Sequence, residues 1–196
     1  MFVPSYRDAS LQKLQDSELW EMFREGNRPA FSVLFLRHYN RLYNYGFNFY
    51  AKEEDVKDGI QKLFFRLWKD RENLDHAHSV YAYLLHSLRR ILLRKKEKLE
   101  ALHLRNDQYA QMTSFNSGNI EQKIIQKEIH QEKRQLFRQA FNSLTNRQKE
   151  ALVLRLEHGL KNKEIAQVMN LTHQRVRNLI SQGTKRLKDQ IFEITH

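Results

Sequence analysis

The stretch from Thr172 to Lys188 contains five Lys or Arg residues and no Asp or Glu. Gln174 and Asn178 stand among these cations. Arg side chains suit the acceptors on guanine, whereas Gln and Asn suit adenine. The composition of this stretch therefore favours the binding of a polyanion, and its mixture of side chains favours DNA.

The residues on either side have the spacing of a helix-turn-helix. Apolar Ile165, Val168 and Met169 would form the inner face of a first helix, and Asn170 suits a left-handed turn. Thr172 is a good N-cap for a second helix, whose leading residues meet base edges in this motif. The exposed side of that helix would carry His173, Gln174, Arg175, Arg177, Asn178, Ser181, Lys185 and Arg186. The alternative is an ordinary helical hairpin with a solvated basic face.

The first helix of this motif lacks one usual feature. Lys161 stands where Ser or Thr commonly forms a capping pair with a residue such as Glu164. We therefore expect Asn162 to cap this helix one residue later.

A second basic segment lies in the N-terminal half. Residues 86–98 contain six Lys or Arg and one Glu. A solvated helix end, favoured by the helix dipole, is the alternative to a second contact with a polyanion. If the segment does contact a polyanion, we expect four of these cations to contact DNA, namely Arg89, Arg90, Arg94 and Lys95.

Candidates for catalysis are few. His76 and His78 form an H-x-H pair, but Glu72 and Asp75 do not complete a recognisable catalytic or metal site around them. The chain has no cysteine and no glycine-rich phosphate loop. From the sequence we therefore predict that the protein is not an enzyme. We expect it to have no catalytic residue, metal site, cofactor or small-molecule substrate.

These residues must be positioned by helices. Apolar residues recur at intervals of three and four from Phe31, from Val56 and from about Ser79. A shorter helix before them would be capped by Asp16 or Ser17 and end at Gly26–Asn27. Thr145 and Gln148 form a capping box, the helix after them would end at Gly159, and another helix is expected from about Ile120.

The pattern as a whole predicts an all-α protein of two small helical domains. We expect a first domain at 1–98, a flexible linker at 99–122, and a second domain with the helix-turn-helix at 123–196. The linker would include the residues between 105 and 119, where periodicity is weak and Asn, Ser and Gly are frequent.

Composition supports the same reading. The 196 residues carry a formal net charge of +11, with a pI of about 9.8, which favours nucleic acid or an anionic membrane surface. No apolar run approaches the roughly 18 residues that span a bilayer, and the N-terminus has no signal-peptide core. Together with the lack of cysteine, this predicts a cytoplasmic protein.

Two segments resemble a known family. "DGIQKLFFRLW", residues 58–68, is similar to the core-binding helix of bacterial sigma factors, and residues 144–188, "LTNRQKEALVLRLEHGLKNKEIAQVMNLTHQRVRNLISQGTKRLK", resemble their promoter-distal DNA-binding domain. The two-domain arrangement is similar to the extracytoplasmic-function class. Gly59 departs from the pattern, which has an apolar residue there, and this should loosen the helix by about 1 kcal/mol.

The resemblance implies roles for residues of the first domain. Contacts with core RNA polymerase would come from Asp58, Gln61, Lys62 and Phe65, while Phe64, Leu67 and Trp68 would hold the core. The fourth helix, with Tyr81, Arg89, Arg90, Arg94 and Lys95, would contact the proximal promoter element. The loop at 72–79 would hold a base flipped from the melted strand.

The resemblance also implies partners. They are core RNA polymerase, promoter DNA and an anti-sigma factor, commonly a membrane-bound one. The implied function is to direct polymerase to specific promoters and help melt them. A helix-turn-helix regulator that acts without polymerase is the alternative, but it leaves the second basic segment unexplained.

Overall fold

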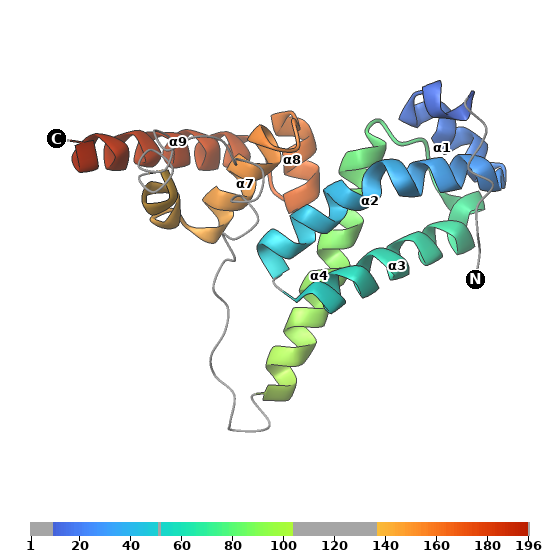
Figure 1. Cartoon of the computed structure of the whole chain (residues 1–196), viewed down its shortest axis with the longest axis horizontal. Coiled ribbons are helices and arrows are strands. Elements are labelled where there is room, and N and C mark those ends of the chain that lie inside the picture. The colour runs from blue at the N-terminus through green and yellow to red at the C-terminus, as the bar shows by residue number, and fades with distance from the viewer. Residues whose placement is uncertain (1–9, 51, 104–136, 196) are drawn as a thin grey trace, which may run out of the picture. The chain divides into compact units, whose positions relative to one another are not determined.

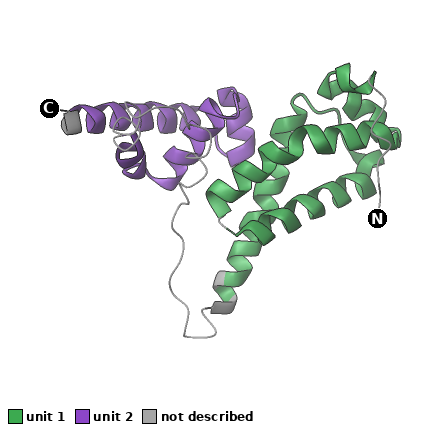
Figure 2. Cartoon of the chain, in the orientation of Figure 1, with its two compact units in different colours: residues 1–111 green, residues 112–196 purple. Residues whose placement is uncertain are grey.

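The structure is a computed structural model that describes residues 10–50, 52–103 and 137–195. Within these ranges every regular element is a helix, which confirms the all-α prediction (Figure 1). The chain divides into two compact units, residues 1–111 and 112–196 (Figure 2).

The described part of the first unit contains four α-helices and two short 3-10 helices. The α-helices are α1 (Asp16–Arg24), α2 (Arg28–Tyr50), α3 (Glu53–Asp70) and α4 (Val80–His103), and the 3-10 helices are η1 (Leu11–Lys13) and η2 (Arg71–Asn73). Each of α1, α3 and α4 packs against α2. Their apolar faces meet in a core whose largest fully buried side chains include Trp20, Phe23 and Tyr45.

The start of α1 differs from the expectation. Gln15 is the N-cap, and its backbone N–H donates to the Glu18 carboxylate at 2.7 Å. Asp16 and Ser17 lie inside the first turn instead, so the prediction that one of them caps the helix is wrong. Asp16 has other partners, because its carboxylate lies 2.6 Å from Arg37 and 2.9 Å from His38. The predicted end of this helix is confirmed by the left-handed Gly26, at φ 91°.

Two glycines let the helices of the first unit approach closely. A Cβ at Gly46 of α2 would lie 2.7 Å from a methyl carbon of Val56, and a Cβ at Gly59 of α3 would lie 3.0 Å from Leu92 of α4. Gly59 therefore provides room for the contact between α3 and α4. This contact offsets the cost of glycine in a helix interior.

The second unit contains a helical segment at 137–142, then α7 (Asn146–Leu156), α8 (Asn162–Met169) and α9 (His173–Thr195). The capping box predicted for α7 is confirmed, with Gln148 N–H donating to the Thr145 hydroxyl and Thr145 N–H donating to the Gln148 side chain. Gly159 has a φ of 68° just after α7. Gly183 allows α9 to cross α7, since a Cβ there would lie 3.0 Å from Leu152.

The segment between the units falls largely outside the described residues. Helix α4 continues to His103, five residues past the boundary expected at 98. The helix expected from about Ile120 lies outside the described residues up to 136. Among the described helices, none is long and apolar enough to cross a membrane.

Candidate nucleic-acid interface

The turn between α8 and α9 has the geometry of a helix-turn-helix. Asn170 adopts the left-handed conformation, with φ 53° and ψ 53°, and the N–H of Leu171 donates to the carbonyl of Ala166 at 2.9 Å. The Thr172 hydroxyl then accepts from the N–H of Arg175 at 3.2 Å, which caps α9. Both local predictions, the left-handed Asn170 and the Thr172 cap, are confirmed.

The cap of α8 is different from the one predicted. Lys161 is the N-cap residue, and its backbone N–H donates to the Glu164 carboxylate at 2.8 Å. Asn162 is already helical, so it does not cap the helix. The carboxylate of Glu164 thus satisfies a backbone donor at this end and complements the positive end of the helix dipole.

Helix α9 presents its polar side chains to solvent. Its buried stripe contains Val176, Leu179 and Leu187, which pack toward α7 and α8. Every residue predicted to contact DNA on this helix is exposed, namely His173, Gln174, Arg175, Arg177, Asn178, Ser181, Lys185 and Arg186. The cations on this face lie on the outside of the unit, where a polyanion can reach them.

Two of these side chains are already paired with each other. The Gln174 amide donates to the Asn178 side-chain oxygen at 3.1 Å. They are four residues apart and so lie on the same face of α9. The pairing orients both amides near the start of α9, the part of a recognition helix that meets base edges.

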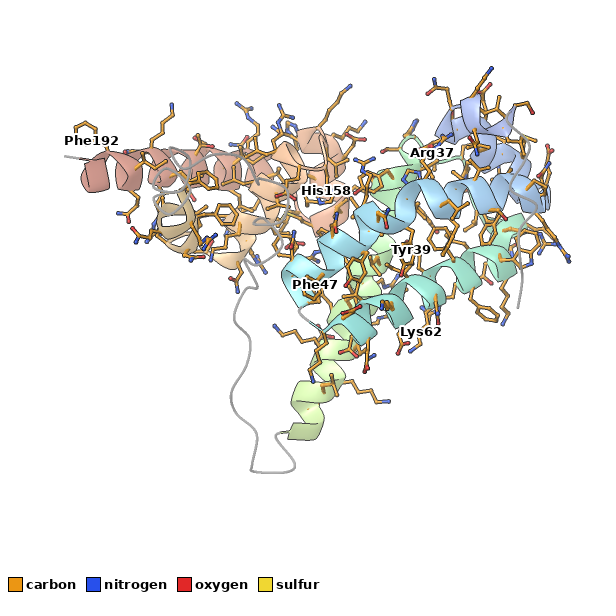
Figure 3. All side chains as sticks on the ribbon, in the orientation of Figure 1. Arg37, Tyr39, Phe47, Lys62, His158 and Phe192 are labelled. Atoms are coloured by element: carbon orange, nitrogen blue, oxygen red, sulfur yellow. The ribbon has the colours of Figure 1, made fainter. Side chains whose placement is uncertain are left out.

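The exposed face of α3 carries the four residues assigned to core polymerase. Asp58, Gln61 and Lys62 are exposed, and Lys62 extends away from α2 (Figure 3). Phe65 has 71% of its surface exposed, an unusual state for a phenylalanine. The opposite face is buried, with Phe64 and Leu67 each 4% exposed, as the resemblance implies.

The remaining core residue of that set is less enclosed. Trp68 is half-buried, and its ring packs against Phe31, with 5.1 Å between ring centroids. The guanidinium of Arg71 lies 5.1 Å from the Trp68 ring centroid, which covers part of the indole.

The basic face of α4 is only partly open. Arg90 and Arg94 are exposed, and Arg89 is half-buried. Lys95 instead forms ion pairs with α3, at 2.6 Å from Asp55 and 3.4 Å from Asp58. The hydrogen bond with Asp55 is the main cause of a raised pKa at Lys95.

Tyr81, the remaining residue of α4 predicted to contact DNA, is enclosed within the first unit. It is 6% exposed, its ring stacks on His38, and the guanidinium of Arg41 lies 3.7 Å from the ring centroid. The ring is enclosed because Tyr81 lies on the side of α4 that packs against α2. The role of Tyr81 as a DNA contact stays a prediction.

The loop at 72–79 is tied to α1 at two points. The indole N–H of Trp20 donates to the Asp75 carbonyl at 3.1 Å, and His76 Nδ1 lies 2.7 Å from the Glu21 carboxylate. Partial burial would raise the pKa of Glu21, but hydrogen bonds with His76 and Arg24 outweigh it and lower that pKa. Among the described residues, no group of three potential ligands could hold a metal ion.

Two contacts were not predicted from the sequence, that of Arg41 with Tyr81 and that of Asp55 with Lys95. Asp55 comes three residues before Asp58, so both carboxylates lie on one flank of α3. That spacing was visible in the sequence, although their shared partner Lys95, some 40 residues later, was not. No local signal marks Arg41, because its contact with Tyr81 joins two helices that are distant in sequence.

Comparisons with known proteins agree with this geometry. The family model for sigma-70 region 2 matches residues 34–101, and the model for sigma-70 region 4 matches residues 134–187. A search of curated proteins found no match.

Two solved structures share the fold. The sigma factor RpoE of Bartonella quintana, in complex with the anti-sigma factor NepR, is 17% identical with a TM-score of 0.61, over 82% of this chain and 96% of that one. CnrH, in complex with the cytosolic domain of CnrY, is 21% identical with a TM-score of 0.58, over 91% of this chain and 97% of that one. With region 2 matched in its first unit and region 4 in its second, the chain belongs to the sigma-70 family.

Proposed function

We propose that this sigma factor binds core RNA polymerase, directs it to specific promoters and helps to melt them. The main support is that each of its two units presents exposed cations on one helix, Arg90 and Arg94 on α4 in the first and the polar face of α9 in the second. Two basic helices suit two separate promoter elements, with α9 at the distal one and α4 at the proximal one.

Core polymerase would bind the exposed face of α3. This face combines an acid, an amide, a cation and a large apolar ring, in Asp58, Gln61, Lys62 and Phe65. Aromatic residues exposed beside polar ones are typical of protein interfaces. The same face lies beside Lys95 of α4, so polymerase and DNA would bind adjacent surfaces of the first unit.

An anti-sigma factor is the third proposed partner. The similar sigma factor RpoE was solved with the anti-sigma factor NepR, and CnrH was solved with the cytosolic domain of CnrY. A partner of this kind, anchored in a membrane or free, would restrain the chain in the cytoplasm. The sigma-70 family regulates transcription without catalysing a reaction itself, so no substrate or cofactor is proposed.

Transcription in vitro tests the proposal directly. The full chain is added to core RNA polymerase on genomic DNA fragments, and transcript starts are mapped. We expect transcripts that depend on the chain and begin downstream of a shared pair of sequence elements. If no transcript start depends on the added chain, the proposed function is wrong.

The alternative, a regulator that acts without polymerase, makes a different prediction. Such a regulator should bind a specific duplex tightly by itself, whereas a sigma factor should bind it weakly until polymerase is added. Binding to a mapped promoter fragment, with and without core polymerase, separates the two. The exposed cations on α4 favour the sigma factor, because a lone helix-turn-helix does not require them.

A further inference from the structure

The surface at the start of α4 presents a guanidinium in place of the expected phenol. The Tyr81 ring stacks on the imidazole of His38, with 5.3 Å between ring centroids and 15° between ring planes. The guanidinium of Arg41 lies over the same ring, 3.7 Å from its centroid. Tyr81 is buried and Arg41 is exposed. A ligand that approaches this surface therefore meets Arg41.

This stack is anchored in the core of the first unit. His38 is 1% exposed, and its Nε2 lies 2.9 Å from the Asp16 carboxylate. Arg37 donates to the same carboxylate at 2.6 Å. Since Asp16 belongs to α1 and His38 to α2, the imidazole that supports Tyr81 is held by two helices. The Arg41 guanidinium thus lies on a support that is already in place, the stacked rings of Tyr81 and His38. This lowers the conformational entropy that is lost when a ligand binds the guanidinium.

A guanidinium that lies on an aromatic ring is suited to one kind of nucleic-acid contact. It keeps its charge, and its planar shape allows a second flat group to stack on it. Arg planes and aromatic rings bind single strands in this way, because unpaired bases can turn out and stack on them. Paired bases in a duplex stack on one another and cannot do so.

The remaining basic residues of α4 make this surface attractive to a DNA strand. Arg89 and Arg90 follow Tyr81 on α4 by eight and nine residues, which is roughly 12–14 Å along the helix axis. The positive charge along the helix would draw the phosphate backbone toward it, and Arg41 on the neighbouring α2 would be within the region of that field.

We propose that Arg41 is a further DNA-binding residue, which stacks an unpaired base of the melted promoter strand on its guanidinium. The identity of that strand rests on the proposed function. Arg41 would be a contact supplied by α2, in addition to those of α4. Tyr81 then acts as a positioning residue, since it touches the guanidinium and not the base.

The test measures binding of the full chain to DNA without polymerase. A labelled mixed-sequence strand of about 20 nucleotides is compared with its duplex by fluorescence anisotropy at low salt. The variants are Arg41→Ala and Arg41→Lys. Arg28→Ala is the matched control, because Arg28 is also exposed on α2 and lies over an aromatic ring, 5.8 Å from the centroid of Trp68.

We expect Arg41→Ala to weaken single-strand binding by about 5- to 150-fold, the range for loss of one stacked base. Arg41→Lys should lose nearly as much, since it keeps the charge but not the plane. Duplex binding should change little, and Arg28→Ala should behave as the parent. Tyr81→Phe keeps the ring and should keep the affinity. Thermal unfolding followed by circular dichroism checks that each variant is folded.

Several results would overturn the proposal. Equal losses on single strand and duplex would indicate a phosphate contact, and full affinity in Arg41→Lys would show that charge alone matters. An Arg41→Ala variant that binds the single strand as tightly as Arg28→Ala does would also refute it. The binding assay contains no polymerase, so its result does not depend on the transcription assay. Failure of the chain to direct transcription would refute the proposed function but would not change the measured binding of single strands by Arg41.

Discussion

Arg175 and Lys185 are both exposed on α9, but they lie ten residues apart. That separation is about 15 Å along the helix axis. Arg175 is in the first turn, where a recognition helix reaches base edges, whereas Lys185 is farther along, where a helix leaves the groove and meets phosphates. We therefore expect Arg175 to contact bases and Lys185 to contact phosphates.

Arg175→Ala should relax the sequence preference at one or two positions of the distal promoter element. A base-reading Arg typically discriminates by about 1–3 kcal/mol. Lys185→Ala should instead weaken all promoters nearly equally and lower the slope of log affinity against log salt by about one. The measurement is transcription by the holoenzyme from a promoter library randomised in the distal element, at several salt concentrations.

The two variants control for each other, because each removes one exposed cation from the same helix. An even loss of output in Arg175→Ala, combined with a changed preferred sequence in Lys185→Ala, would mean that the assigned roles are reversed.

At the scale of elements, α1 and α2 are joined by a carboxylate with two basic partners. Partial burial alone would raise the pKa of Asp16, but hydrogen bonds and charge from His38 and Arg37 outweigh it and lower the pKa to about 2. A lowered carboxyl pKa stabilises the folded state when the pH is above 3.8, the pKa of Asp16 in the unfolded chain. This stabilisation is lost as the pH falls toward 2.

Asp16→Asn should therefore lower the free energy of unfolding at pH 7 by about 1–2 kcal/mol, after allowance for solvent screening. The parent and the variant should converge as pH falls from about 4 toward 2, because Asp16 is protonated first in the unfolded state of the parent and then increasingly in its folded state. Urea unfolding followed by circular dichroism measures the gap. Asp70→Asn, at an exposed position at the end of α3, is the control. A gap that stays constant between pH 7 and pH 2 would argue against this account.

The crossing of α2 with α3 depends on the missing side chain at Gly46. A Cβ there would lie 2.7 Å from one methyl carbon of Val56 and 3.2 Å from the other. Valine is stiff at χ1, so it cannot move away easily. Gly46→Ala should therefore destabilise the fold by about 1–3 kcal/mol, despite the better helix propensity of alanine.

The double variant Gly46→Ala with Val56→Ala tests this explanation. Removing the valine methyls should recover part of the loss, so the two changes should be less than additive in urea unfolding. Strict additivity would show that the cost arises somewhere other than this contact.

At the scale of the molecule, each unit has its own buried core. Leu19, Leu42 and Ile60 are fully buried in the first, and Leu154 and Ile165 in the second. A domain with its own core can in principle fold alone. This organisation suits a protein whose two basic helices bind separate promoter elements.

Fragments 1–111 and 112–196 should each fold independently. We expect each to unfold cooperatively, and the sum of their circular dichroism spectra to reproduce the spectrum of the intact chain. Each fragment should also bind promoter DNA more weakly than the intact chain in the holoenzyme, because linking two sites raises the effective concentration of the second. A fragment without cooperative unfolding would mean that its core depends on the other unit.

Much of the fold followed from the sequence because the deciding interactions are local. The capping box at Thr145 and Gln148, the left-handed Asn170 and the Thr172 cap each involve residues within a few positions of one another. The apolar spacing of the helices likewise depends only on the period of the α-helix. The exposed basic face of α9 could be read in the same way.

Only the tertiary structure decided which side chains of other helices contact each face of a given helix. The sequence identified Tyr81 and Lys95 as DNA contacts, yet Tyr81 is enclosed by α2 and Lys95 is paired with Asp55 and Asp58 of α3. Asp16 has the sequence pattern of a cap but serves as an ion-pair partner for α2. Each of these outcomes depends on a side chain from another element, and helical periodicity does not reveal which element will lie against a given face.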